Sequence, residues 1–180
     1  GTLSLLCGSV GGLLDSVEWR DVIAFTGSAD TGEKIRSHPQ VLKSGAAVNI
    51  EADSLNSMIL DPDAEDETYD AFIRDAHLEI TQKAGQKCTA VRRLLIPRDR
   101  LDEVLEDLVE RFGRTTVGDP SADGVTMGPL STPSQGDAAR EGITALLERA
   151  EVVYGGPEGA LVSAAGAELH TRSFVSPTLL

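Results

Sequence analysis

The stretch with the clearest capacity for chemistry is Gly85-Gln86-Lys87-Cys88-Thr89, in which a cysteine lies between a glycine-containing turn and a β-prone run. A thiol is nucleophilic only as the thiolate, and backbone N–H groups or a nearby cation such as Lys87 stabilise that anion. Cys88 is therefore the candidate nucleophile. The competing interpretation is a small buried hydrophobe at the start of a strand, which is the commoner fate of an intracellular cysteine.

Cys88 follows a predicted helix and precedes a predicted strand. The helix is predicted from about residue 67 to residue 83, and the β-prone residues 91–96 predict the strand, which Pro97 ends. Cys88 would then lie in the connection between them. The apolar residues spaced to bury one face of this helix are Phe72, Ile73, Ala76 and Ile80.

The clearest helix of the chain is predicted further along. Its apolar residues recur at three- and four-residue intervals with charges between them, a pattern typical of a helix that packs on a sheet. A last helix is predicted from about residue 133 to residue 150, then a strand over 151–154 and a Gly- and Ala-rich loop through Glu168. The apolar residues of the clearest helix are Leu101, Val104, Leu105, Leu108, Val109 and Phe112.

The N-terminal part of the chain predicts a strand, a glycine turn and a helix. Residues 21–25 form a β-branched run, and the helix follows from residue 28 or 29 to near Pro39. A helix N-terminus with little side-chain bulk in front of it binds phosphate oxygens through backbone N–H groups and the helix dipole. By themselves, Gly27 and Gly32 are explained as well by an ordinary strand-to-helix turn.

Three further strands are predicted in the first sixty residues. The run over residues 3–7 is typical of a short buried strand, which would place Cys7 in the core. The strand over residues 46–50 presents Glu51 at its end, where parallel α/β sheets usually collect functional side chains. Another short strand covers residues 57–60.

No metal site is predicted from the acidic and histidine residues. An EF-hand loop that started at Asp61 would need glycine and glutamate where the chain has Asp66 and Phe72. His77 and Glu79 lie two residues apart on a predicted helix, so they point in different directions and suit a shared metal poorly.

Three segments together resemble the NAD(P)-dependent aldehyde dehydrogenase superfamily. Residues 80–90, Ile-Thr-Gln-Lys-Ala-Gly-Gln-Lys-Cys-Thr-Ala, are similar to the segment in which that superfamily presents its catalytic thiol as Gly-Gln-x-Cys. Phe25-Thr26-Gly27-Ser28, followed by Gly32, resembles its cofactor-binding turn. Glu51 stands where the superfamily keeps its general base, ahead of the cysteine.

The resemblance implies roles for six residues. Cys88 is the implied nucleophile and Glu51 the implied general base. Most members follow that glutamate with Leu-Gly-Gly, whereas this chain has Ala52-Asp53-Ser54, so the loop cannot use glycine's permissive backbone in the same way. The implied cofactor-binding residues are Thr26, Gly27, Ser28 and Gly32.

The implied fold is α/β and aldehyde dehydrogenase-like. Residues 1–53 are expected to form the C-terminal part of a Rossmann-like NAD(P)-binding domain, and residues 54–180 much of the nucleophile-bearing catalytic domain. The implied chemistry is oxidation of an aldehyde to the carboxylic acid, with hydride transfer to NAD or NADP. Residues 51–56 are most similar to the branch that serves bacterial phenylacetate catabolism after ring opening, which implies an acyl-CoA semialdehyde as substrate and slightly favours NADP.

Length and composition set the remaining expectations. The 180 residues, 41% of them hydrophobic, are enough for a sizeable core, but a complete member of the superfamily is much longer. We therefore expect an internal fragment that is inactive alone. The superfamily's oxyanion-stabilising asparagine, its ribose-binding lysine and its second cofactor-contact region would all lie elsewhere in the full-length protein. The full-length protein is expected to be a homo-oligomer.

The charge argues against two classes of partner. A formal net charge of −13 disfavours nucleic acid and anionic membranes, since either would need a basic surface. Cys7 and Cys88 are too few for a disulfide scaffold, and neither a leader pattern nor a long apolar span is present. The expected partner is a small-molecule aldehyde, and the expected compartment is the cytoplasm.

Two other functions remain open at this level. A cysteine hydrolase would pair Cys88 with a histidine base, for which His38, His77 and His170 are the candidates. A catalytically silent binding module would keep the fold without the chemistry, against which the pair Glu51 and Cys88 argues.

Overall fold

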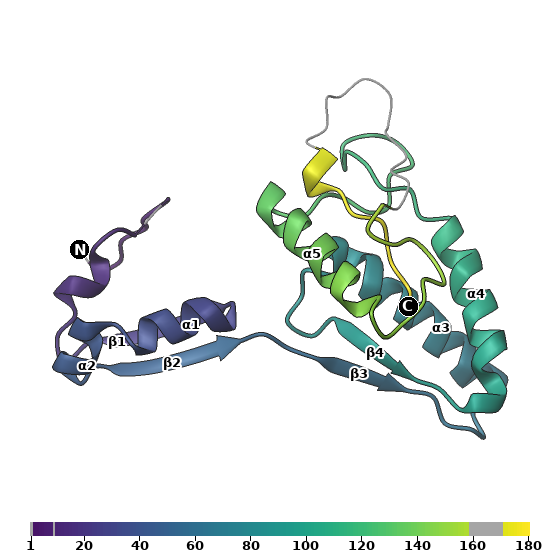
Figure 1. Ribbon diagram of the computed structural model, residues 1–180, viewed down its shortest axis with the longest axis horizontal. Coiled ribbons are helices and arrows are strands. Elements are labelled where there is room, and N and C mark those ends of the chain that lie inside the picture. The colour runs from purple at the N-terminus through teal and green to yellow at the C-terminus, as the bar shows by residue number, and fades with distance from the viewer. Residues whose placement is uncertain (1, 9, 159–170) are drawn as a thin grey trace. The chain divides into compact units, whose positions relative to one another are not determined.

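The chain divides into two compact units, Gly1–Ser54 and Leu55–Leu180. The computed structural model describes residues 2–8, 10–158 and 171–180 (Figure 1). Each unit is described by itself below. The assignment of residues 1–53 to a cofactor domain and of residues 54–180 to a catalytic domain remains a prediction.

The smaller unit is built on a parallel pair of strands. β1 (Val22–Gly27) pairs with β2 (Ala47–Ala52), and the register sets Thr26 opposite Glu51. The helical connection between two parallel strands makes this a βαβ unit (Figure 1). A short 3-10 turn at Leu13–Ser16 precedes β1.

Two helices, not one, connect these strands. α1 (Ala29–Arg36) begins after Ser28, as predicted. The chain then starts a second helix, α2 (Pro39–Ser44), at the proline that was expected only to end the first. Proline's fixed φ angle suits the first turn of a helix, and this property explains the missed element. Gly45 ends α2 with a left-handed φ of 69°.

The predicted strand over residues 3–7 is wrong, and so is the buried position predicted for Cys7. The segment has no regular secondary structure, and Cys7 is exposed. Leu3 and Leu5 are 91% and 86% exposed. Apolar residues alone do not make a strand, because a strand needs a partner for its backbone hydrogen bonds, and residues 2–7 have none in the described sheets.

The larger unit opens with a second parallel pair. β3 (Asn56–Ile59) pairs with β4 (Val91–Leu95), and α3 (Asp66–Thr81) crosses between them. A 3-10 turn at Gln82–Gly85 follows α3 directly. The predicted helix and both predicted strands are therefore confirmed, with shifts of one or two residues at their ends.

α4 (Leu101–Gly113), preceded by a 3-10 turn at Arg98–Arg100, packs against α3 to form the core. Phe112 and Leu108 are fully buried, as the helical spacing predicted. Ile80, the last residue of the predicted apolar face of α3, is partly buried against the cluster. The buried residues of this cluster are Leu60, Tyr69, Phe72, Ile73, Ala76, Val104, Leu108 and Phe112.

The C-terminal part contributes α5 (Pro133–Leu146) and a 3-10 turn at Thr171–Ser173. α5 is shorter than predicted. The strand predicted over residues 151–154 is reduced to one antiparallel bridge between Tyr154 and Leu179, so that prediction is wrong. Most of the predicted Gly- and Ala-rich loop, residues 159–168, lies outside the described residues.

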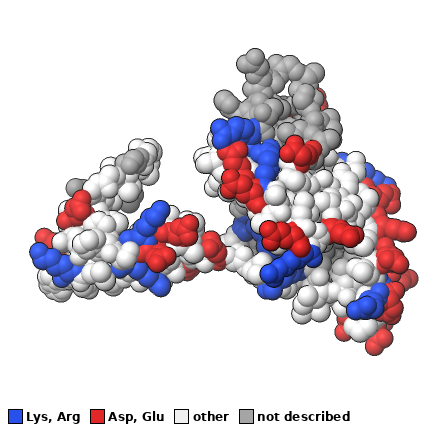
Figure 2. All heavy atoms as spheres, in the orientation of Figure 1, with Lys and Arg blue, Asp and Glu red and all other residues white. Residues whose placement is uncertain are grey.

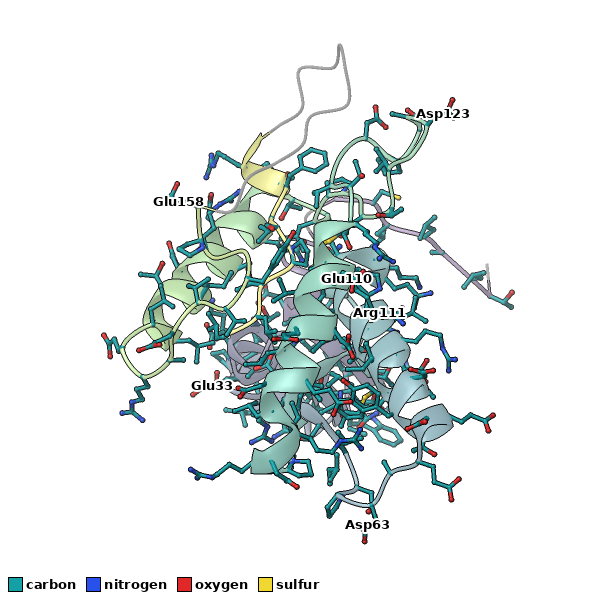
Figure 3. All side chains as sticks on the ribbon, turned by 90° about the vertical axis from the view of Figure 1, so that its right-hand side faces the viewer. Glu33, Asp63, Glu110, Arg111, Asp123 and Glu158 are labelled. Carbon is teal, nitrogen blue, oxygen red and sulfur yellow. The ribbon has the colours of Figure 1, made fainter. Side chains whose placement is uncertain are left out.

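Groups of charged side chains are spread over both units, and acidic ones gather on the side of the larger unit where α3 and α4 lie (Figure 2). The labelled side chains of Glu110 and Arg111 both project from α4 (Figure 3).

Among the helices in the described part of the chain, none is long and apolar enough to cross a membrane.

Candidate active site

Cys88 lies on a backbone turn of unusual shape, which we call the nucleophile turn and define as residues 82–90. Lys83, Ala84 and Gly85 have φ angles of 53°, 52° and 70°. Three consecutive left-handed residues are rare, because each residue with a Cβ costs about 1–2 kcal/mol in this region. The surrounding structure must therefore stabilise this conformation.

Gln86 holds the turn to the C-terminal part of the same unit. Its Oε1 accepts hydrogen bonds from the backbone N–H and the Oγ of Ser131, both at 2.9 Å. Its Nε2 donates to the carbonyl of Lys83 at 2.8 Å. The glutamine of the Gly-Gln-x-Cys segment thus ties the strained backbone to a segment more than forty residues away.

Three further contacts hold the turn from other directions. Arg92 donates from a guanidinium nitrogen to the carbonyl of Gly85 at 2.7 Å. Asn56 donates from Nδ2 to the carbonyl of Cys88 at 2.9 Å. Ala84 packs against a small apolar cluster formed by Val117, Met127 and Phe174.

Cys88 itself is exposed and is not part of a disulfide. The residue two positions later, Ala90, is fully buried at the start of β4. The alternative interpretation of Cys88 as a buried hydrophobe is therefore wrong. Because Cys7 is also exposed, burial does not explain any difference in reactivity between the two thiols.

Lys87, expected as a cation for the thiolate, has another partner. Its Nζ donates to Glu79 Oε1 at 2.6 Å and to Gln82 Oε1 at 3.0 Å. The ammonium group is therefore engaged by the last turn of α3 and by the start of the nucleophile turn.

The predicted cofactor turn lies in the smaller unit, where β1 passes into α1. Ser28 caps α1, because its Oγ accepts the Thr31 N–H at 3.4 Å. Gly32 is buried, and a Cβ there would lie 2.7 Å from Ile50 Cγ2 on β2. The absence of a side chain at Gly32 thus allows α1 to pack closely on the sheet, as glycine does in dinucleotide-binding turns.

Asp53 occupies part of this helix N-terminus. Its carboxylate accepts the backbone N–H of Ala29 at 3.3 Å, and its own N–H donates to the carbonyl of Gly27. Its φ is 52°, which an aspartate tolerates better than most residues. The loop therefore keeps a left-handed residue although it lacks the Gly-Gly of the superfamily.

Glu51 lies inside β2 and is exposed. Its strand partner is Thr26, so β1 and β2 bring Thr26, Gly27, Ser28 and Glu51 to the same end of one small sheet. Cys88 belongs to the larger unit. The pairing of Glu51 with Cys88 remains a prediction.

The candidate bases for a hydrolase have other contacts. His77 Nε2 lies 2.9 Å from Thr115 Oγ1, and the ring packs on Phe112. Burial, assisted by the positive charge of Arg111, lowers the pKa of His77 from its ordinary value, so the ring favours the neutral form. His38, in the smaller unit, lies 3.5 Å from Asp15, and His170 is outside the described residues.

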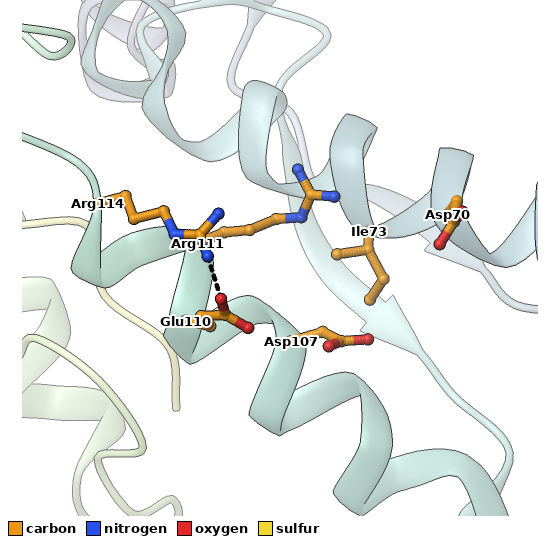
Figure 4. Close-up of a pocket in the computed structure, with 6 residues that line it drawn as sticks. All are labelled: Asp70, Ile73, Asp107, Glu110, Arg111 and Arg114. Atoms are coloured by element: carbon orange, nitrogen blue, oxygen red, sulfur yellow. Dashed lines mark hydrogen bonds and ion pairs between the residues drawn. The ribbon is translucent and has the colours of Figure 1, made fainter.

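A small pocket of about 160 Å³ lies between α3 and α4 (Figure 4). Asp70 and Ile73 come from α3, and Glu110 on α4 forms an ion pair with Arg114 at the end of the same helix. None of the six predicted site residues lines it. No cluster of three or more metal-binding side chains occurs in residues 2–8, 10–158 and 171–180.

Sequence reasoning missed the contacts that hold these elements in place. Glu79 was considered only as a metal ligand, and its spacing of eight residues from Lys87 across a helix end has no periodic signature. Asp53 could have indicated a contact with the N-terminus of α1, because this chain has an acid where the superfamily has glycine. The pairing of Gln86 with Ser131 depends on how the chain returns, which no local pattern reveals.

Comparison with known protein families shows which family the chain belongs to. The whole chain, residues 1–180, matches the aldehyde dehydrogenase family. It belongs to that family. The expected α/β, aldehyde dehydrogenase-like fold is confirmed by the solved structures described below.

Two curated relatives show the degree of similarity. The 3,4-dehydroadipyl-CoA semialdehyde dehydrogenase of Aromatoleum evansii is 44% identical, over 100% of this chain and 35% of that protein. The hydroxyisobutyraldehyde dehydrogenase of Mycolicibacterium austroafricanum is 38% identical over 74% of this chain and 26% of that protein. The chain thus spans about a third of the length of these aldehyde dehydrogenases or less.

Solved structures agree with the fold. The succinic semialdehyde dehydrogenase of Streptococcus pyogenes in complex with NADP⁺ aligns with a TM-score of 0.76 at 25% identity, over 96% of this chain and 36% of that one. A Pseudomonas syringae aldehyde dehydrogenase with NAD⁺ and octanal gives 0.72 at 27% identity, over 88% and 30%. The first of these two enzymes was solved with NADP⁺ and the second with NAD⁺.

Proposed function

We propose that this chain supplies the nucleophile, the general base and part of the cofactor site for NAD(P)-dependent oxidation of an aldehyde in a full-length protein of its relatives' size. The observation that carries the proposal is the nucleophile turn. Cys88 is exposed and follows a left-handed backbone segment, and the glutamine of its own Gly-Gln-x-Cys segment holds that turn, an arrangement that suits a preorganised nucleophile.

The proposed reaction begins at Cys88. Its thiolate attacks the aldehyde carbon, and the S–C bond forms as the carbonyl oxygen takes the negative charge. Backbone N–H groups would stabilise that oxyanion. Loss of hydride from the carbon then converts the thiohemiacetal to a thioester on Cys88, and the bound nicotinamide supplies the chemistry of accepting that hydride.

In this proposal Glu51 acts in the second step, the hydrolysis of the thioester. Its carboxylate takes a proton from water, directly or through a second water, and the resulting hydroxide attacks the thioester carbon. The S–C bond breaks, the carboxylic acid leaves and the thiolate is restored. The exposed position of Glu51 on β2 is compatible with access to water.

The β1–α1 turn fits a phosphate group in part. Ser28 is small, and Gly32 lets α1 lie close to β2, so backbone N–H groups are available at a helix N-terminus. The Ala29 N–H already donates to a carboxylate, that of Asp53, so an acceptor oxygen is accommodated there. Thr26, Gly27, Ser28 and Gly32 would hold the cofactor in this proposal.

The proposed substrate is an acyl-CoA semialdehyde formed after aromatic ring opening in phenylacetate catabolism. The support is the 44% identity to a 3,4-dehydroadipyl-CoA semialdehyde dehydrogenase, together with the similarity of residues 51–56 to that branch. We also propose NADP as the preferred cofactor, on the resemblance of residues 51–56 to that branch. Comparing kcat/KM for the two cofactors tests the preference.

Aldehyde-dependent NAD(P)H formation by the full-length protein tests the function. We expect Cys88→Ser to abolish it, while Cys7→Ser leaves it unchanged as a matched control. The 180-residue chain alone should show no steady-state turnover. Unchanged turnover in Cys88→Ser would refute the proposed nucleophile. Aldehyde-independent hydrolysis that requires Cys88 would favour a hydrolase, and cofactor binding without any turnover would favour a silent binding module.

A further inference from the structure

We propose that Glu79 is a positioning residue for Cys88 and acts through its ion pair with Lys87. The inference rests on the proposed function, in which Cys88 is the nucleophile. Neither acid nor lysine touches substrate in this proposal. Together they fix the backbone that presents the thiol.

The first argument is the geometry of the pair. Lys87 Nζ lies 2.6 Å from Glu79 Oε1, and the two side chains are only 18% and 24% exposed. The exposed ion pairs of this unit have much freer partners, such as Arg114 and Glu110 at 74% and 62%. Solvent therefore screens the Glu79–Lys87 pair less, and breaking it should cost more.

The second argument is the environment of the carboxylate. Glu79 Oε2 is buried and has no hydrogen-bond partner among the described residues. Such a group is unfavourable, because a buried oxygen that loses water without gaining a donor incurs a desolvation cost. Lys87, which binds the other oxygen, Oε1, is the nearby cation that offsets the negative charge of the carboxylate. Removing either partner would leave the other charge poorly solvated, so a variant that breaks the pair should disturb the turn around Lys87.

The third argument is location. Glu79 lies in the last turn of α3, and Lys87 is the residue directly before Cys88. Between them the backbone passes through the three left-handed residues 83–85, which are stable only while their surroundings hold them. Gln86 anchors this turn to Ser131 on one side, and Lys87 anchors it to α3 on the other.

The test measures the thiol directly in the full-length protein. Glu79→Gln and Lys87→Met are each expected to slow two processes by about 10- to 100-fold. These are the alkylation of Cys88 by iodoacetamide, measured by mass spectrometry, and the burst of NAD(P)H formation. The KM for the cofactor should stay within about twofold, because neither variant changes a residue of the proposed cofactor-binding turn, which belongs to the other unit. Lys87→Arg, which keeps the charge, should recover most of the rate.

A double variant tests whether the two residues act together. Glu79→Gln with Lys87→Met should be no slower than the slower single variant, since both remove one interaction. Additive losses would overturn the proposal. A matched control is Glu110→Gln, which removes an exposed ion pair of the same unit and should leave alkylation unchanged. Circular dichroism and thermal unfolding check that each variant is folded.

The outcomes separate this inference from the proposed function. If Cys88→Ser is inactive but Glu79→Gln is alkylated and turns over at the normal rate, only the positioning role is refuted. A lowered melting temperature with normal alkylation would make the pair purely structural and also refute it. Normal turnover in Cys88→Ser would refute both.

Discussion

The two units differ most in how they bury apolar side chains. The larger unit encloses a cluster of eight buried residues around α3 and α4. In the described part of the smaller unit, Val17 and Val41 are the buried hydrophobic residues, while Trp19 and Val22 are 76% and 72% exposed. The larger unit therefore has a closed apolar core, whereas the described part of the smaller unit buries few apolar side chains.

This difference matters because the candidate catalytic residues are divided between the units. Cys88 lies on a turn that is held from three directions inside the well-packed unit. Glu51 and the cofactor turn lie on a two-stranded parallel sheet, a structure that usually needs cover on both faces. We therefore expect the nucleophile to be preorganised within its unit, and the base and cofactor turn to depend more on the remainder of a full-length protein.

The largest expected effect is that of replacing the proposed base, Glu51, which should slow thioester hydrolysis without slowing hydride transfer. Glu51→Gln keeps the side chain's size and removes the base, so we expect steady-state turnover of the full-length protein to fall about 10²- to 10⁴-fold. The first-turnover burst of NAD(P)H should stay near normal, because Cys88 performs that step. Stopped-flow absorbance measures both phases, and mass spectrometry should detect an acyl adduct on Cys88.

An equal loss of burst and steady state would contradict this division of labour. Glu51 would then activate the thiol or shape the site. Glu33→Gln, an exposed acid on α1 in the same unit, is the control for a change in charge alone.

The contrast in packing predicts the next largest effect. Phe112→Ala removes a fully buried ring from the core of the larger unit and should lower the free energy of unfolding by about 3–5 kcal/mol. Val41→Ala, in the smaller unit, should cost clearly less, since it removes only two methyl groups from a unit with few buried apolar side chains. Urea unfolding followed by circular dichroism in the full-length protein measures both. Equal losses would show that the smaller unit is packed as well as the larger one.

The smallest predicted effect concerns Asp53. Its carboxylate competes with a phosphate for the N-terminus of α1, so Asp53→Asn should tighten NAD(P)⁺ binding about two- to fivefold at low salt. Asparagine also tolerates the left-handed backbone at this position. Isothermal titration calorimetry at two salt concentrations provides the measurement. A similar gain in Glu33→Gln would indicate a general charge effect, and weaker binding in Asp53→Asn would show that the carboxylate supports the turn.

Much of the fold could be predicted because its causes are local. The apolar faces of α3 and α4 follow from helical spacing, and Phe72, Ile73, Val104 and Leu108 are buried as that spacing requires. The end of β1 and the start of α1 follow from a glycine turn and a capping serine. The same reasoning failed for residues 3–7, since a strand depends on a partner that the segment itself does not contain.

The sequence by itself determined the family, the candidate nucleophile and the candidate base, because residue types and their order along the chain carry that information. Only the tertiary structure decided how Cys88 is presented. The left-handed turn is held by contacts that no local pattern reveals. Lys87 pairs with Glu79 across a helix end, and Gln86 bonds to Ser131, which is far away in the sequence. Their free energies depend on distance and burial in three dimensions, and neither is set by local residue preference.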